Sequence, residues 1–192
     1  MTASAASPRH FLFLVTSSRR DGNSEQLARR AAANLPATDS QTWLNLADLP
    51  LPAFADLRHA TSENWTPIIA GHARTLLEAT LAATDLVMVA PVYWYSLPAP
   101  AKLYLDHWSA WLRAPGYDFK NRMGGKTMWA VSTFSDTDPR FAEPLKETLR
   151  LSADYMHMRW GGQLLGSGNR PGEVLTDAAA LAAAKNFFAI AR

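Results

Sequence analysis

Strand-like segments alternate with helical segments along the whole chain, and this alternation limits the fold more than any other feature. Five strands are predicted at residues 11–15, 41–46, 85–90, 126–132 and 160–166. Residues 86–90 form a continuous apolar run, which is typical of a strand that is buried on both faces. Strands that alternate with helices predict an α/β fold, in which helices cover both faces of a parallel sheet.

The segments between the strands carry apolar residues three or four positions apart, as a half-buried helix does. The first predicted helix contains Leu27, Ala28, Ala31, Ala32 and Leu35. Further helices are predicted at 68–81, 98–112, 141–156 and 175–191, the last with Thr176 as its cap. Right-handed crossovers leave few strand orders. In the order 2-1-3-4-5, the loops 16–24 and 91–98 meet at the switch point, where ligands bind in such folds.

Length and composition narrow the class of protein. The 192 residues suit one domain, 1–192, in which residues 1–9 are expected to be a loose tail. Lys and Arg number 19 against 17 Asp and Glu, a balance that argues against a nucleic-acid partner. The absence of cysteine excludes disulfides and thiolate chemistry. Apolar runs are too short to cross a membrane, so we expect no membrane partner and a cytoplasmic location.

The first loop has the composition of a phosphate-binding turn. It runs Thr16-Ser17-Ser18-Arg19-Arg20-Asp21-Gly22-Asn23-Ser24 between a buried strand and a helix. Free backbone N–H groups and the helix dipole favour an anion at a helix start, and hydroxyls can donate to phosphate oxygens. Taken alone, the same residues also suit a simple helix cap in a solvated loop.

The second loop exposes an unusual amount of aromatic surface. It runs Pro91-Val92-Tyr93-Trp94-Tyr95-Ser96-Leu97-Pro98 after the third strand. Three consecutive aromatic residues at the ligand-binding edge of a sheet favour a flat ring system as their partner, because aromatic rings stack. The alternative is that these rings pack on a neighbouring helix or on a second subunit.

Three segments together resemble the flavodoxin-like, FMN-dependent NAD(P)H oxidoreductases, the group of NADPH-dependent FMN reductases and quinone reductases. The segment 17–24 resembles the family's Ser-x-Arg-x-x-Gly-Asn-Thr/Ser phosphate loop. The segment 91–108 is similar to its Pro-x-Tyr-Trp-x-x-x-Pro loop and the helix that follows. Met123-Gly124-Gly125-Lys126-Thr127 is similar to its Gly-Lys step before the fourth strand. The resemblance implies a flavodoxin-like three-layer sandwich with a five-stranded parallel sheet in the order 2-1-3-4-5.

The resemblance also assigns residues to the cofactor. Positions 17, 19, 23 and 24 would hold the FMN phosphate, the second loop would line the ribityl chain and the isoalloxazine ring, and the third loop would add a further flavin contact. The expected cofactor-binding residues are Ser17, Ser18, Arg19, Asn23, Ser24, Pro91, Val92, Tyr93, Trp94, Tyr95, Ser96, Thr133, Phe134 and Ser135. The third loop, 132–139, lacks the paired glycines of the family, so its three residues are assigned by position only.

The predicted function is transfer of hydride from NADH or NADPH through FMN to a quinone, a flavin or a similar aromatic acceptor. The flavin would carry the chemistry, so no catalytic side chain is assigned and no metal is expected. The resemblance also implies a homodimer or homotetramer. Two alternatives stay open: a flavodoxin-type electron carrier without hydride chemistry of its own, and a phosphate-binding module.

Overall fold

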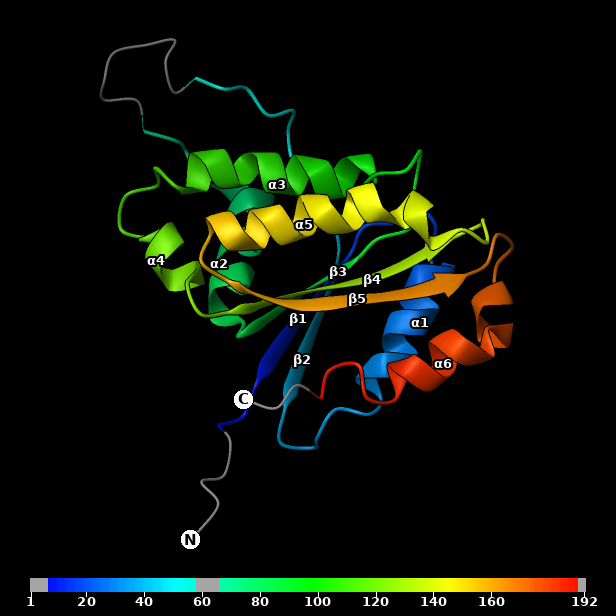
Figure 1. Cartoon of the computed structure of the whole chain (residues 1–192). Coiled ribbons are helices and arrows are strands. Elements are labelled where there is room, and N and C mark those ends of the chain that lie inside the picture. The colour runs from blue at the N-terminus through cyan, green and yellow to red at the C-terminus, as the bar shows by residue number, and fades with distance from the viewer. Residues whose placement is uncertain (1–6, 58–65, 190–192) are drawn as a thin grey trace, which may run out of the picture.

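The computed structural model describes residues 7–57 and 66–189, and it contains one sheet between two layers of helices (Figure 1). The five strands are all parallel and lie in the order β2-β1-β3-β4-β5. They are β1 (His10–Val15), β2 (Ser40–Asn45), β3 (Asp85–Val89), β4 (Thr127–Phe134) and β5 (Arg159–Ser167). This strand order confirms the predicted fold class.

Six α-helices and two short 3-10 helices lie between or after the strands within the described residues. The helices are α1 (Asn23–Ala32), α2 (Gly71–Ala82), α3 (Ala99–Trp111), α4 (Phe119–Met123), α5 (Glu143–Tyr155) and α6 (Ala178–Ala184). The 3-10 helices are η1 (Pro139–Ala142) and η2 (Glu173–Thr176). In Figure 1, α1 and α6 cover one face of the sheet, whereas α2, α3 and α5 cover the other. No helix in this part of the chain is long and apolar enough to span a membrane.

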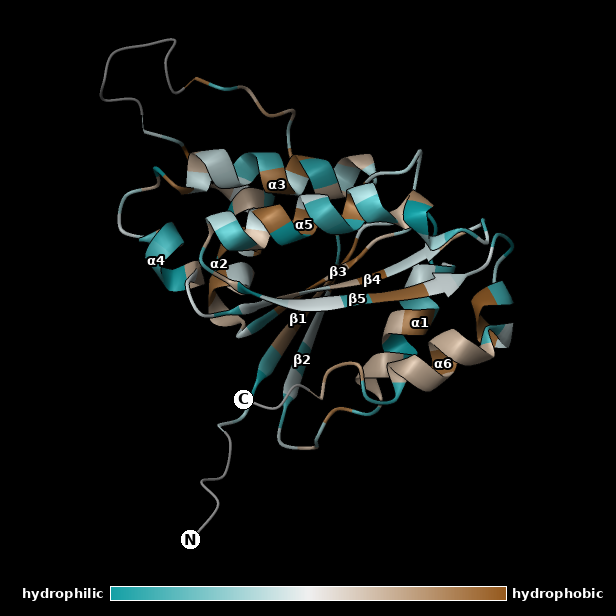
Figure 2. Cartoon of the chain, in the orientation of Figure 1, coloured by the Kyte–Doolittle hydropathy of each residue, from teal (hydrophilic) through white to brown (hydrophobic). Residues whose placement is uncertain are grey.

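Each face of the sheet has its own apolar core, because side chains alternate between the two faces of a strand. Phe11, Phe13 and Val15 of β1 pack with Leu27 of α1. Leu12 and Leu14 point the other way, into the core under α2, α3 and α5. Figure 2 shows the matching pattern on α5, whose residues alternate between hydrophobic and hydrophilic colours. Burial on both faces explains why β1 and β3 are apolar along their length.

Two sequence predictions about helices were wrong. The last helix covers Ala178–Ala184 and not 175–191, because Asp177, rather than Thr176, caps it by accepting from the Ala180 N–H (2.9 Å). After it the chain turns, so that Phe188 packs into the core beneath β1. The short helix α4 lies between the predicted helix 98–112 and the predicted strand 126–132, where no helix was predicted, and it buries Phe119 and Met123.

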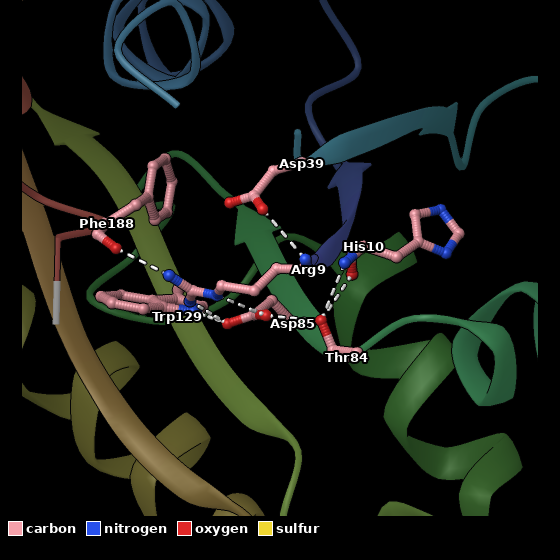
Figure 3. Close-up of polar contacts among 7 residues, drawn as sticks. All are labelled: Arg9, His10, Asp39, Thr84, Asp85, Trp129 and Phe188. Carbon is pink, nitrogen blue, oxygen red and sulfur yellow. Dashed lines mark hydrogen bonds and ion pairs between the residues drawn. The ribbon is translucent and has the colours of Figure 1, made fainter. Parts of the chain in front are cut away.

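A buried ion pair closes the sheet edge that lies away from the carboxyl ends of the strands (Figure 3). The Arg9 guanidinium binds the Asp85 carboxylate, which is 2% exposed, and donates to the Phe188 carbonyl (2.8 Å). Trp129 also donates to Asp85 (2.9 Å). Residues 1–6 of the expected tail lie outside the described residues, but Arg9 is firmly held. The network therefore joins the two ends of the described chain to β3 and β4.

Candidate functional site

A hollow of about 220 Å³ lies at the carboxyl edge of the sheet. The loops that follow β1, β3, β4 and β5 form its walls, as expected at the switch point between β1 and β3. The lining residues are Ser17, Arg19, Gly22, Asn23, Ser24, Pro91, Val92, Tyr93, Thr133, Phe134, Ser135, Gly168 and Asn169. The two loops predicted from motifs and the third loop, assigned by position, thus meet in one place.

The start of α1 gives this hollow a set of backbone donors. The helix begins at Asn23 after Gly22, and no side chain caps it. The N–H groups of Asn23, Ser24 and Glu25 have no hydrogen-bond acceptor among the described residues, whereas the Gln26 N–H bonds to the Gly22 carbonyl (3.0 Å). The first helical turn therefore leaves free N–H donors and a positive dipole end at the wall of the hollow, an arrangement that suits a phosphate group.

The two adjacent arginines of the first loop differ in their surroundings. Arg20 forms an exposed ion pair with Asp48, 2.5 Å between nitrogen and oxygen. Arg19 lines the hollow, and no carboxylate in the described part of the chain pairs with it. Of the two, Arg19 is the cation that a bound anion can use.

The hydroxyl groups of the site are partly engaged with one another. Ser24 Oγ lies 2.7 Å from Thr133 Oγ1, a buried contact that joins α1 to the end of β4. One hydroxyl hydrogen makes this bond, so the other remains available to a ligand. Ser17 Oγ accepts from the Arg19 N–H (3.0 Å), which shapes the loop while leaving the hydroxyl hydrogen free.

Asn23 lines the hollow, but its side chain makes hydrogen bonds to a neighbouring loop. Its amide donates to the Arg170 carbonyl (2.9 Å) and accepts from the Gly172 N–H (2.9 Å). Both ends of the side-chain amide are thereby used to hold residues 168–172 against the start of α1. The structure thus gives Asn23 a positioning role that the motif by itself did not reveal.

Sequence reasoning missed the fourth loop of the site, which contributes Gly168 and Asn169. A Cβ on Gly168 would lie 2.8 Å from the Val174 nitrogen and 2.9 Å from the Asn23 side-chain nitrogen, so only glycine fits there. The available signal was the turn-rich run Gly168-Asn169-Arg170-Pro171-Gly172 directly after the fifth strand.

The aromatic loop forms a tight hairpin at the rim of the hollow. Tyr93 and Ser96 exchange two backbone hydrogen bonds, of 3.1 and 3.0 Å. The residues between them, Trp94 and Tyr95, have φ angles of 48° and 63°, the left-handed geometry of a type I′ turn. Residues with a Cβ pay about 1–2 kcal/mol each for this geometry. Trp94 is nevertheless 92% exposed and Tyr95 54% exposed.

Some predicted residues lie beside the hollow and not in its wall. Tyr93 is part of the wall, as are Thr133, Phe134 and Ser135 of the uncertain third loop. Four predicted residues are outside the lining and exposed: Ser18, Trp94, Tyr95 and Ser96. The three hairpin residues are close enough to meet a ligand that extends beyond the hollow, because they directly follow Tyr93.

A second hollow is larger, at about 570 Å³, but it lacks the chemistry for a phosphate. It lies between residues 46–54 and the start of α3, and its lining is apolar apart from Asp106. That carboxylate is paired with Lys102 (2.5 Å). An apolar hollow with an acidic edge does not attract an anion, so the smaller hollow is the candidate site.

Comparison with known proteins agrees with this architecture. Residues 9–188 match the family model described as "Flavodoxin-like fold". The chain belongs to this family. A Bacillus subtilis (strain 168) protein named "Putative NAD(P)H-dependent FMN-containing oxidoreductase YwqN" is 32% identical over 167 residues, which are 86% of this flavodoxin-like chain and 89% of that protein.

Solved structures show the same fold. "The Structure of Trp Repressor Binding Protein from Bacillus subtilis" is 26% identical, has a TM-score of 0.74, and is covered over 99% of its length by 95% of this chain. An FMN-dependent NADH-azoreductase from Bacillus anthracis str. Ames Ancestor, solved with FMN, has a TM-score of 0.63 at 13% identity. It matches 93% of this chain and 98% of its own length. At that identity the likeness shows the fold alone.

Proposed function

We propose that this flavodoxin-like protein binds FMN in the candidate site and passes hydride from NAD(P)H through it to an aromatic acceptor such as a quinone. The observation that carries the proposal is that free N–H groups, an Arg19 side chain without a carboxylate partner among the described residues, and an aromatic hairpin meet around one hollow. The name of the 32% identical relative, a NAD(P)H-dependent FMN-containing oxidoreductase, supports the same activity.

The residues present fit the phosphate end of FMN. A phosphate monoester needs several donors and positive charge, and the site offers the first turn of α1, hydroxyl hydrogens and the Arg19 guanidinium. The Gly168 position also fits, because the absence of a Cβ lets the fourth loop close against Asn23. Arg19 and the serines would hold the phosphate, and Asn23 would keep the fourth loop in place.

The aromatic hairpin fits the ring end. A hollow of about 220 Å³ is smaller than most complete ligand sites, which measure roughly 300–1,000 Å³. The phosphate and the chain behind it would fill the hollow, so the flat ring would rest against Tyr93, Trp94 and Tyr95 at the rim. Aromatic side chains and the flanking backbone groups then orient the ring and keep water from one side of it.

The lining also suits a reaction in which the cofactor carries the chemistry. FMN, when bound, supplies a ring that accepts hydride from a nicotinamide and gives it to an acceptor. None of the residues that line the hollow is a histidine, an aspartate or a glutamate. The chain's own contribution is therefore to bind and orient the reactants, so we assign no general acid or base.

The proposed function extends to the protein's electron donor and acceptor, its assembly and its location. We include NADH and NADPH as electron donors, a quinone, flavin or nitro compound as acceptor, a homodimer or homotetramer as the assembly, and the cytoplasm as the location. Exposed aromatic surface at the rim supports the assembly, because apolar patches often mark contacts. Sedimentation that shows only monomer at assay concentrations would contradict it.

The first test is an FMN titration of the purified protein, followed by absorbance at 340 nm with NADH or NADPH and a quinone. Saturable quenching of flavin fluorescence and acceptor-dependent nicotinamide oxidation above the free-FMN control are expected. Tight FMN uptake without nicotinamide oxidation would favour an electron carrier. A folded protein that takes up no FMN but binds a simple phosphoryl compound would be a phosphate-binding module.

A further inference from the structure

The rim of the candidate site carries a second aromatic contact, outside the hairpin itself. The rings of Tyr95 and Phe141 lie 5.5 Å apart between centroids, with 53° between their planes. Tyr95 comes from the hairpin after β3, and Phe141 comes from η1 after β4. Phe141 is 39% exposed, so both rings keep a free surface.

Local structure holds the two rings in place. The Val92 N–H donates to the Thr133 carbonyl (2.9 Å), which fixes the base of the hairpin to the end of β4. On the other side, the Asp138 side chain accepts from the Arg140 N–H (3.0 Å) and caps η1. Phe141 therefore sits on a capped turn next to a hairpin of fixed geometry, so the pair is already ordered before any ligand binds.

The position of Tyr95 and Phe141 relative to the hollow indicates which reactant these two rings can contact. Neither Tyr95 nor Phe141 lines the hollow, whereas Tyr93, Phe134 and Ser135 of the same two loops do. A cofactor anchored in the hollow would be contacted by the inner residues first. Tyr95 would meet the edge of the flavin ring, and the surface that it and Phe141 still expose is left for a second molecule that lies over the rim.

The charged residues near Phe141 indicate whether the second molecule at the rim is charged or uncharged. The neighbouring Arg140 guanidinium donates to both oxygens of the Asp138 carboxylate, from Nε at 3.1 and 2.9 Å and from Nη2 at 2.6 Å. This pair carries no net charge, so a charged substituent on a ligand gains little from it. A wall of two rings beside a neutralised pair suits an uncharged planar ring.

We propose that Tyr95 and Phe141 form the wall of an acceptor subsite and that Phe141 is a specificity-determining residue for uncharged planar aromatic acceptors. This inference rests on the proposed function, since it needs FMN in the hollow and NAD(P)H as donor. It adds a residue that no motif singled out and commits the acceptor to one chemical class.

The test compares two acceptors on the FMN-loaded protein. Menadione has a planar aromatic ring, whereas ferricyanide has none and needs no stacking surface. Phe141→Leu keeps apolar bulk but removes the ring. We expect it to lower kcat/KM for menadione about two- to tenfold, mainly through KM, and to leave ferricyanide reduction unchanged. Phe141→Tyr should restore the wild-type value for menadione.

The matched control is Leu151→Ala on α5, which removes another exposed apolar side chain (57% exposed). It should change neither acceptor. A second readout does not depend on turnover: calorimetric titration of the FMN-loaded protein with 1-naphthol, a planar ring that is not reduced. Phe141→Leu should weaken this binding by the same two- to tenfold factor.

The outcomes separate this inference from the function on which it rests. Equal loss with both acceptors, or no loss with menadione, would overturn the aromatic wall while leaving the oxidoreductase in place. Wild-type protein that reduces ferricyanide but not menadione would also overturn it. Failure of the wild type to oxidise NADH or NADPH with either acceptor would instead refute the proposed function.

Discussion

At the scale of a residue, the two adjacent arginines after β1 differ because only one of them has a carboxylate partner among the described residues. Arg20 is held by Asp48, whereas Arg19 faces the hollow with no carboxylate partner in the described part of the chain. The family resemblance assigned only Arg19 to the phosphate, and the structure adds that Arg20 is engaged elsewhere, by a partner 28 positions away in the chain. The difference gives a matched pair of variants.

Arg19→Gln is expected to weaken FMN binding about tenfold, since a charge-assisted bond to a phosphate contributes about 1.5 kcal/mol or more. The loss should shrink at high salt, because the contact is exposed and screened. Fluorescence titration at two ionic strengths measures both effects. Arg20→Gln is the control and should change affinity by less than about twofold. Equal effects of the two variants would show that Arg19 has no special role.

At the scale of elements, the aromatic hairpin and the loop after β5 are shaped for the site at some cost in stability. Left-handed geometry at positions 94 and 95 favours Asn or Gly, yet the chain places Trp and Tyr there. Strain of this kind is typical of functional loops. The start of α1 leaves its donors free, and Asn23 holds another loop instead of capping the helix.

Trp94→Asn is expected to raise the free energy of unfolding by about 0.5–1 kcal/mol, because Asn tolerates the left-handed region better than Trp. The same variant should weaken FMN binding, because the exposed ring is lost from the rim. Urea unfolding and FMN titration measure the two effects. A variant that loses stability as well as affinity would show that the Trp94 ring is structural.

Asn23→Ala removes both hydrogen bonds to the loop 168–172, so it should lower the free energy of unfolding by about 1–3 kcal/mol and weaken FMN binding. Faster hydrogen exchange at the Gly172 amide would report the release of the loop. Asn34→Ala is the control, because it removes only an exposed bond to the Arg30 carbonyl within the same turn. An unchanged exchange rate at Gly172 would contradict the positioning role.

At the scale of the whole molecule, the site and the stabilising ion pair lie at opposite edges of one sheet. The cofactor loops follow the carboxyl ends of the strands, whereas Asp85 begins β3 and binds Arg9 at the other end. Burial by itself raises the pKa of Asp85, but hydrogen bonds from Arg9, Trp129 and Thr84 outweigh it, so that the pKa lies below its ordinary value.

The lowered pKa of the Asp85 carboxyl makes the free energy of unfolding depend on pH in the acid range. The stability that Asp85 contributes is fully present above the ordinary carboxyl pKa of about 4, and it is lost as pH falls through the lower pKa of the folded state. Asp85→Asn should lower the free energy of unfolding by about 3–5 kcal/mol at pH 7, because Arg9 loses its buried partner. It should also flatten the pH dependence below pH 4.

Urea unfolding between pH 3 and pH 7 checks this prediction. Asp48→Asn is the control, because Asp48 is an exposed carboxylate and its loss should leave the acid limb as in the wild type. FMN affinity at pH 7 should also survive in Asp85→Asn protein that remains folded, since the ion pair lies away from the site. An unchanged acid limb in Asp85→Asn would refute the role of this carboxylate.

Sequence patterns predicted the strands well because each pattern is local. The apolar run of β3 and the alternation of β2 report burial directly, and their bounds agree with the structure to within one or two residues. The last helix was overestimated, because alanine-rich spacing continues past Ala184 but Phe187 and Phe188 turn to pack on Trp129. Helix α4 was missed, because five residues give too little periodicity to recognise.

The sequence by itself determined the fold class and the first two loops around the hollow, because local apolar patterns and loop composition encode them. The strand order and the third loop followed from the resemblance to a known family. Only the tertiary structure decided which donors are free. Pairing of Arg20 with Asp48, of Asn23 with the loop after β5, and of Tyr95 with Phe141 joins residues far apart in the chain. Such contacts depend on how the layers pack, and no local pattern records them.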